Sequence, residues 1–190
     1  MLTATYSLVA ITNEHKATKN MLGKLQQGIR NILEKLPKVD LPLMKAIMNK
    51  LVQFDQHCRN RKVEVHLLPA IRTKAVTVPL LAELDFLAAA ASDLLAWAHG
   101  KLSGMGHDMA ESAREVCLSM QVYCRKMLER LAREEEHLFP LAERLLSMDE
   151  WFAMAAKFLS EDAMARQRRR DASHAQFMTQ GSTSSHAPAL

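Results

Sequence analysis

The chain has 190 residues, 48% of them hydrophobic and only 5% aromatic, and its formal net charge is +4 at pH 7. This length and composition predict one domain with a sizeable core, and the predominance of Ala, Leu, Lys, Arg and Glu indicates an all-α fold. No apolar run approaches the ~20 residues that span a bilayer, so we expect no membrane insertion. The three cysteines lack C-x-x-C spacing, which argues against a disulfide framework or a zinc knuckle and favours a reducing, cytoplasmic setting.

The first part of the chain predicts two helices separated by proline. Apolar residues recur at helical spacing from about residue 7 to 34 and stop before Pro37, and His15 lies roughly in phase with them. Asp40 is a suitable N-cap for a second helix with Pro42 in its first turn. We expect this second helix to reach about residue 68.

The following part repeats this arrangement. Thr77 and Pro79 predict the start of a third helix, which ends near residues 103–106. Capping boxes at 108–111 and 147–150 predict a fourth helix that continues to about residue 146 and a short fifth helix after it. We therefore expect residues 1–162 to form an up-down-up-down four-helix bundle with a short fifth helix.

Residues 163–190 are expected to be a disordered, basic tail. Four arginines (Arg166, Arg168, Arg169 and Arg170) precede a run rich in Ser, Thr, His and Ala that has little to bury. The favoured interpretation is a solubilising tail, and contact with nucleic acid, acidic lipid or a partner is the alternative. The bundle before it is close to neutral, so we expect no nucleic-acid-binding surface there.

A local repeat links the second helix with the fourth. Shifting the chain by 71 residues aligns 64–69 with 135–140, both of which end in His-Leu-Leu/Phe-Pro. The same shift aligns Arg59 with Arg130 and Val63 with Glu134. This repeat predicts two similar helical hairpins packed about a pseudo-twofold axis.

The segments 13–16, 66–69, 134–146 and 149–151 resemble the hemerythrin-like, HHE cation-binding family. The resemblance covers about residues 7 to 160, and its most specific part is the run from Glu134 to Trp151. It implies a four-helix bundle around a non-haem di-iron site. In that family each hairpin contributes a histidine from one helix and an H-x-x-x-E pair from the next.

Carried over by position, the resemblance implies a degenerate metal site. His15 stands at the first-helix histidine position and Glu134 at the last-helix glutamate position. The other ligand positions carry residues that do not bind iron: Arg59, Val63, Ala88 and Arg130. Two of these are guanidiniums, which would add positive charge where iron would lie.

Two questions stay open at this point. Arg59 and Arg130 either pair with Glu134 or Glu64, or extend to solvent along the bundle surface. His66 and His137 lie two helical turns beyond the lost positions. They either hold a single displaced metal together with Glu134, or are hydrogen-bonded residues at helix ends.

For function, the sequence offers no nucleophile motif and no phosphate-binding glycine loop, so we do not expect an enzyme. The main hypothesis is a non-enzymatic regulatory or protein-interaction module with an unknown protein partner and no cofactor. The alternative is residual non-haem iron binding for oxygen, nitric oxide or redox sensing, or for iron handling. A third hypothesis is haem binding through His15, His66 or His137.

Overall fold

The computed structural model describes residues 2–35, 40–74, 78–105 and 109–181, and its regular structure in these ranges is entirely helical. The all-α class expected from composition is confirmed for this part of the chain. The elements are α1 (Leu2–Glu34), α2 (Leu41–Arg59), η1 (Val63–Leu67), α3 (Leu68–Lys74), α4 (Pro79–Ser103), α5 (Met109–Arg133), η2 (Glu134–Leu138), α6 (Phe139–Leu145) and α7 (Met148–Gly181). The two η elements are π-helical.

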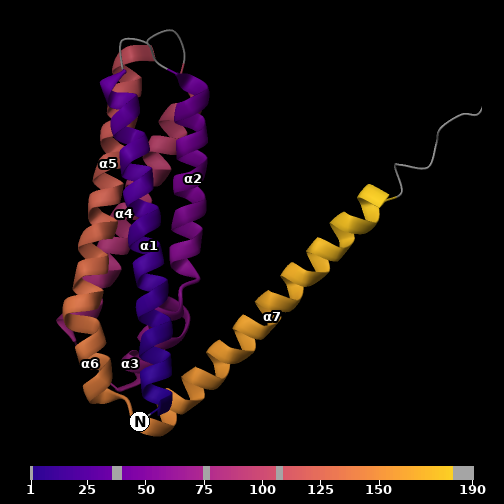
Figure 1. Cartoon of the computed structure of the whole chain (residues 1–190). Coiled ribbons are helices and arrows are strands. Elements are labelled where there is room, and N and C mark those ends of the chain that lie inside the picture. Colours follow the sequence, from indigo (N-terminus) through magenta and orange to yellow (C-terminus); the bar gives the residue numbers. More distant parts are fainter. Residues whose placement is uncertain (1, 36–39, 75–77, 106–108, 182–190) are drawn as a thin grey trace, which may run out of the picture. The chain divides into compact units, whose positions relative to one another are not determined.

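The chain divides into two compact units, and the larger one, residues 9–146, contains most of the core. Figure 1 shows α1, α2, α4 and α5 running side by side in this unit. Their buried faces share one hydrophobic cluster, which is what amphipathic helices of this length require for stability. The cluster includes Leu22, Ile29 and Ile32 of α1, Met48, Leu51 and Phe54 of α2, Ala91, Leu95 and Ala98 of α4, and Val116, Met120 and Tyr123 of α5.

Several predicted helix starts are found in the structure. The side chain of Asp40 accepts a hydrogen bond from the Leu43 amide at 2.9 Å, and Pro42 occupies the first turn of α2. Pro79 is the first residue of α4. In the box at 147–150, Glu150 Oε2 accepts a hydrogen bond from the Ser147 amide at 2.7 Å. Thr77 and residue 108 of the other predicted box lie outside the described residues.

The second helix does not run unbroken to residue 68 as expected. It ends at Arg59, followed by a turn at Asn60 and the π-helical segment η1. The segments η1 and η2 begin 71 residues apart, and each leads into a seven-residue α-helix, α3 or α6. The sequence repeat is therefore also a repeat of backbone structure in this region, since π-helical segments of this kind are rare.

The smaller unit comprises residues 1–8 and 147–190, and its main helix differs in length from the predicted fifth helix. The predicted fifth helix is not short: α7 runs for 34 residues, to Gly181, and includes residues 163–181 of the predicted tail. Within this unit the Ser7 hydroxyl donates a hydrogen bond to the carbonyl oxygen of Trp151 at 3.2 Å. Residues 182–190 of the predicted tail lie outside the described residues. Among the described helices, none combines the length and apolarity needed to cross a bilayer.

Candidate functional site

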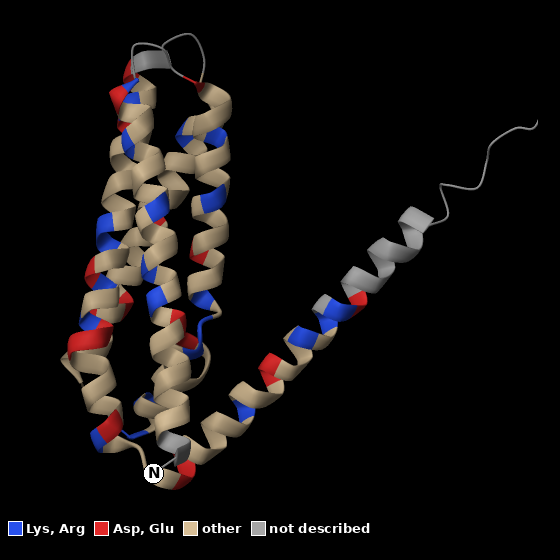
Figure 2. Cartoon of the chain, in the orientation of Figure 1, with Lys and Arg blue, Asp and Glu red and all other residues tan. Residues whose placement is uncertain are grey.

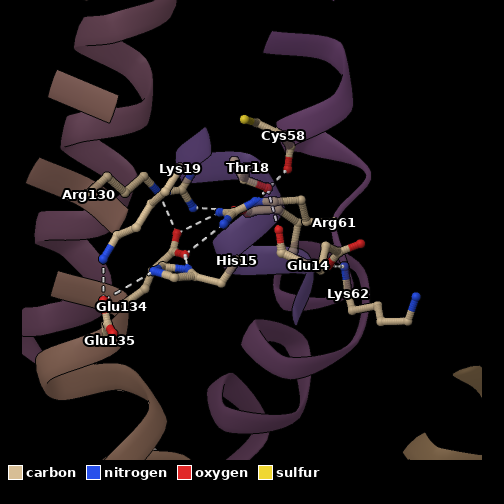
Figure 3. A network of polar contacts seen from close by, with 11 residues as sticks. Glu14, His15, Thr18, Lys19, Cys58, Arg61, Lys62, Arg130, Glu134 and Glu135 are labelled. Atoms are coloured by element: carbon tan, nitrogen blue, oxygen red, sulfur yellow. Dashed lines mark hydrogen bonds and ion pairs between the residues drawn. The ribbon is translucent and has the colours of Figure 1, made fainter. Parts of the chain in front are cut away.

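A buried ion-pair cluster lies in the interior of the larger unit, centred on Glu134 at the start of η2 (Figure 3). The Glu134 side chain has no exposed surface, and that of Arg61 is 1% exposed. Arg61 donates from Nη1 to Glu134 Oε2 at 2.8 Å and from Nη2 to Glu134 Oε1 at 2.7 Å. This two-pronged geometry is the strongest form of an Arg–carboxylate pair.

A second pair completes the cluster. Arg130 Nη2 donates to Glu64 Oε1 at 2.6 Å, and Arg130 Nε lies 3.5 Å from Glu134 Oε1. Arg61 Nη2 also contacts Glu64 Oε1, at 3.2 Å. Two guanidiniums thus face two carboxylates, so the cluster is electrically balanced by protein side chains alone.

His15 of α1 closes one side of this cluster. Its Nδ1 lies 3.5 Å from Glu134 Oε2 and its Nε2 lies 3.6 Å from Glu135 Oε2, which is long for a hydrogen bond. The ring is buried, and its nitrogens have no hydrogen-bond partner among the described residues. Phe139 packs edge-on against the imidazole, with ring centroids 5.4 Å apart.

The break between α2 and η1 places Arg61 in the interior. The Arg61 amide donates to the Cys58 carbonyl at 3.3 Å and its Nε donates to the same oxygen at 3.4 Å. Glu14 of α1 accepts a hydrogen bond from the Lys62 amide at 2.7 Å, which anchors the break to α1. A continuous helix would point residue 61 in a different direction, because successive helical side chains are rotated by about 100°.

Burial and charge act in opposite directions on the two carboxylates. Burial by itself raises the pKa of Glu134, but the Arg61 charge, the neighbouring His15 imidazole, the hydrogen bonds from Arg61 and the Arg130 charge together lower it to about 2. For Glu64, burial dominates over Arg130 and Arg61, and its pKa is raised above the ordinary value. Glu134 is therefore ionised at neutral pH and pairs with Arg61 as a charged carboxylate.

An open pocket of about 430 Å³ adjoins the cluster. Three of the four positions that the family resemblance marked as substituted line it: Arg59, Ala88 and Arg130. The fourth, Val63, is buried at the start of η1. The sequence alignment therefore brought together positions that are neighbours in space, although they carry no metal-ligating side chains.

The open question about Arg59 and Arg130 has a different answer for each of them. Arg130 is buried and pairs with both carboxylates, whereas Arg59 is 65% exposed and contacts Asp55 at 3.0 Å and the Ser92 hydroxyl at 2.9 Å. The expectation that Arg59 could face Glu134 is wrong, because Arg61 takes that place. The 71-residue shift aligns Arg61 with Ala132, which lies in an unbroken helix, so the repeat gave no signal for it.

The structure brings His15 and Glu134 together but adds neither of the other candidate ligands. His137 is half exposed, with Nε2 3.4 Å from Arg133 Nη1 and 3.9 Å from Glu136 Oε2. His66 is partly buried in η1. Within the described ranges, no group of three or more His, Cys, Asp or Glu side chains is arranged to hold a metal ion.

The donor set at the cluster does not fit a di-iron centre. Glu134, His15 and Glu64 are chemically suitable ligands, but Arg61 already occupies both oxygens of Glu134, and Arg130 occupies Glu64. The guanidiniums of Arg61 and Arg130 remain charged at physiological pH, so they keep the carboxylate oxygens from binding a metal ion. In this cluster guanidiniums of the protein, and not metal ions, neutralise the buried carboxylates.

Comparison of the chain with protein-family models, with curated proteins and with solved structures found no match in any of the three.

Proposed function

We propose that this protein is a hemerythrin-like up-down-up-down bundle whose metal centre has been replaced by an internal ion-pair cluster, and that it acts as a non-enzymatic regulatory or protein-interaction module. The observation that carries the proposal is the fully buried fork between Arg61 and Glu134. It neutralises the carboxylate that a family member would offer to iron. The shared core of α1, α2, α4 and α5 and the repeated π-helical segments support the bundle type.

The cluster supports a structural role better than a catalytic one. Its carboxylates and guanidiniums pair with one another. Among the described buried side chains, the atoms left without hydrogen bonds are the two His15 ring nitrogens and Arg130 Nε. The three cysteines are free and buried, which agrees with a reducing compartment such as the cytoplasm. Function then depends on the outer surface of the bundle and on what binds there.

Metal analysis tests the first half of this proposal. Protein produced with iron supplied and purified without chelator should contain far less than one iron per chain, because His15 is the one candidate ligand of the cluster not already paired with arginine. Two irons per chain with an oxo-bridge absorption band would refute the replacement of the metal centre. That result would favour the alternative, a sensor of oxygen, nitric oxide or redox state or an iron-handling protein.

Cross-linking tests the second half. A tagged full-length chain, cross-linked in cells that express it, should form repeated lysine cross-links from the bundle to one partner protein. The matched control is the same chain in cells lysed before the cross-linker is added. Cross-links that stay within the chain in both samples would contradict an interaction module.

A further inference from the structure

A groove lies between α1 and α2, on the outside of the larger unit, with a volume of about 620 Å³. Its floor is apolar and consists of Leu25, Gly28, Ile47 and Phe54, of which Ile47 and Phe54 are buried. Two large apolar side chains stand at its rim with more than a third of their surface exposed, Met21 at 38% and Leu43 at 41%. Apolar surface that stays open to water in this way is typical of binding sites.

Gly28 creates part of the space in this groove. A methyl group added at this glycine would lie 2.9 Å from Ile47 Cδ1, closer than two carbon atoms normally approach. The absence of a side chain therefore leaves the floor open between the two helices. On α2 the lining extends from Leu43 to His57, which is ~21 Å at 1.5 Å per residue and equals about four turns of a bound helix.

The charge around the groove has one sign. Its lining contains two lysines, Lys24 and Lys50, and no carboxylate is among the described residues that line it. Residues 21–57, the span of the lining, contain six Lys and Arg against three Asp and Glu, a net charge of +3. In Figure 2 positions occupied by Lys or Arg are coloured blue at intervals along α1 and α2. An acidic occupant would complement these charges.

From these observations we propose that the groove between α1 and α2 binds an acidic amphipathic helix of a partner protein. The apolar face of that helix lies on Leu25 and on the exposed Met21 and Leu43, and its carboxylates face Lys24 and Lys50. This is the helix-in-groove mode of recognition, with anchors at i, i+3/4 and i+7. The inference rests on the proposed interaction function and names the class of partner.

Two other occupants fit the groove less well. A symmetric dimer would place the same basic surface against itself, since a twofold interface pairs identical patches, and like charges would oppose it. Single-stranded nucleic acid is bound by exposed aromatic side chains on which bases stack, and the one aromatic ring in the lining besides His57 is the buried Phe54. An apolar floor with a basic rim is the complement of an amphipathic acidic helix.

The test uses the full-length chain and a fluorescent, end-capped 15-residue probe peptide with leucines at i, i+3/4, i+7 and i+11 and glutamates on its other faces. Fluorescence anisotropy should show saturable binding. A peptide of the same composition in scrambled order should bind at least about tenfold more weakly. Absence of saturable binding, or equal binding of the scrambled peptide, would overturn the proposal.

Matched variants locate the binding site. Lys24→Glu with Lys50→Glu should weaken binding of the probe at least about tenfold, whereas Lys16→Glu with Lys45→Glu, which makes the same change on exposed lysines outside the lining, should change it less than about threefold. Thermal unfolding confirms that both variants are folded. Equal loss in the two pairs would mean nonspecific attraction and would refute a groove site.

Two further measurements distinguish nucleic acid and a second copy of the chain from the proposed helix. An acidic oligonucleotide that binds more tightly than the peptide and is lost in the Lys24/Lys50 variant would identify a nucleic-acid surface instead. Self-association by sedimentation that disappears in Leu43→Asp would identify a second copy. Either result overturns the inference about the groove and leaves the iron measurement, which tests the metal-free cluster, unaffected.

Discussion

At the scale of single residues, Arg61 supplies the main positive charge that pairs with the buried Glu134. A guanidinium buried to 99% is tolerated because Glu134 and Glu64 supply opposite charge within hydrogen-bond distance. The pair need not add net stability relative to a well-packed apolar pair, but removing one partner leaves the other buried and unpaired. This asymmetry makes the cluster testable by single and double substitution.

Arg61→Met should lower the free energy of unfolding by about 3–5 kcal/mol, because it strands the Glu134 carboxylate without its main partner. The control is Arg59→Met, two residues away and exposed, which should cost less than about 1 kcal/mol. Urea denaturation measures both. In the double variant Arg61→Met, Glu134→Met the loss should be clearly smaller than the sum of the two single losses. Strictly additive losses would show that the fork is not energetically coupled.

The lowered pKa of Glu134 predicts a dependence of stability on pH. Because the folded pKa is about 2 and the ordinary value is 4.5, ionised Glu134 contributes stability that is complete above about pH 5 and is lost as the pH falls from there towards 2. A shift of this size corresponds to about 3 kcal/mol. The raised pKa of Glu64 acts in the opposite direction, but Glu64 is present in both proteins to be compared.

The measurement is the free energy of unfolding between pH 6 and pH 2, for the wild type and for Glu134→Gln. The difference between them should shrink as the pH falls below about 4.5. Glu143→Gln, an exposed glutamate on α6, should keep the wild-type profile. A difference that stays constant over the whole range would mean that Glu134 is not the titrating group.

At the scale of elements, α1 carries two glycines in its interior with different surroundings. A methyl group at Gly23 would meet nothing within 4 Å, whereas at Gly28 it would press on Ile47 Cδ1. Glycine inside a helix costs roughly 0.5–1 kcal/mol relative to alanine, because it loses more backbone freedom on folding. Packing in the described structure therefore does not require a glycine at position 23, whereas contact with Ile47 favours one at position 28.

Gly23→Ala should raise the free energy of unfolding by about 0.5–1 kcal/mol. Gly28→Ala should give less than this or a small loss, since the end of the Ile47 side chain has to move. Thermal and urea denaturation of the two variants side by side measure the difference. If Gly28→Ala were the more stabilising, the close approach of α1 and α2 at the groove floor would be wrong.

At the scale of the whole molecule, the larger unit encloses all three cysteines. Cys58, Cys117 and Cys124 are buried, and burial raises the pKa of their thiols to about 12, 11 and 12 respectively. Thiolate is the reactive form, so both access and ionisation oppose modification in the folded state. Their labelling therefore reports opening of the core.

Native protein should react with iodoacetamide at pH 8 far more slowly than urea-unfolded protein, and the extent of labelling should follow the unfolding transition. Ser160→Cys, on an exposed position of α7, provides a thiol that reacts at once and serves as control. Mass spectrometry of peptides distinguishes the four positions. Rapid labelling of Cys58 alone in the native state would show that the pocket beside it admits the reagent.

The sequence by itself determined the all-α class, the capped start of α2, the start of α4 and the 71-residue repeat, because helix periodicity, caps and prolines act within a few residues. It also identified His15, Glu134 and Arg130 as neighbours through the family resemblance.

The tertiary structure decided which arginine meets Glu134. That choice depends on the break at Asn60 and on Glu14, 48 residues away, which accepts the Lys62 amide. The continuation of α7 to Gly181 was also invisible in a segment without an apolar periodicity. Contacts between distant parts of the chain set the direction of a buried side chain, and no local pattern records them.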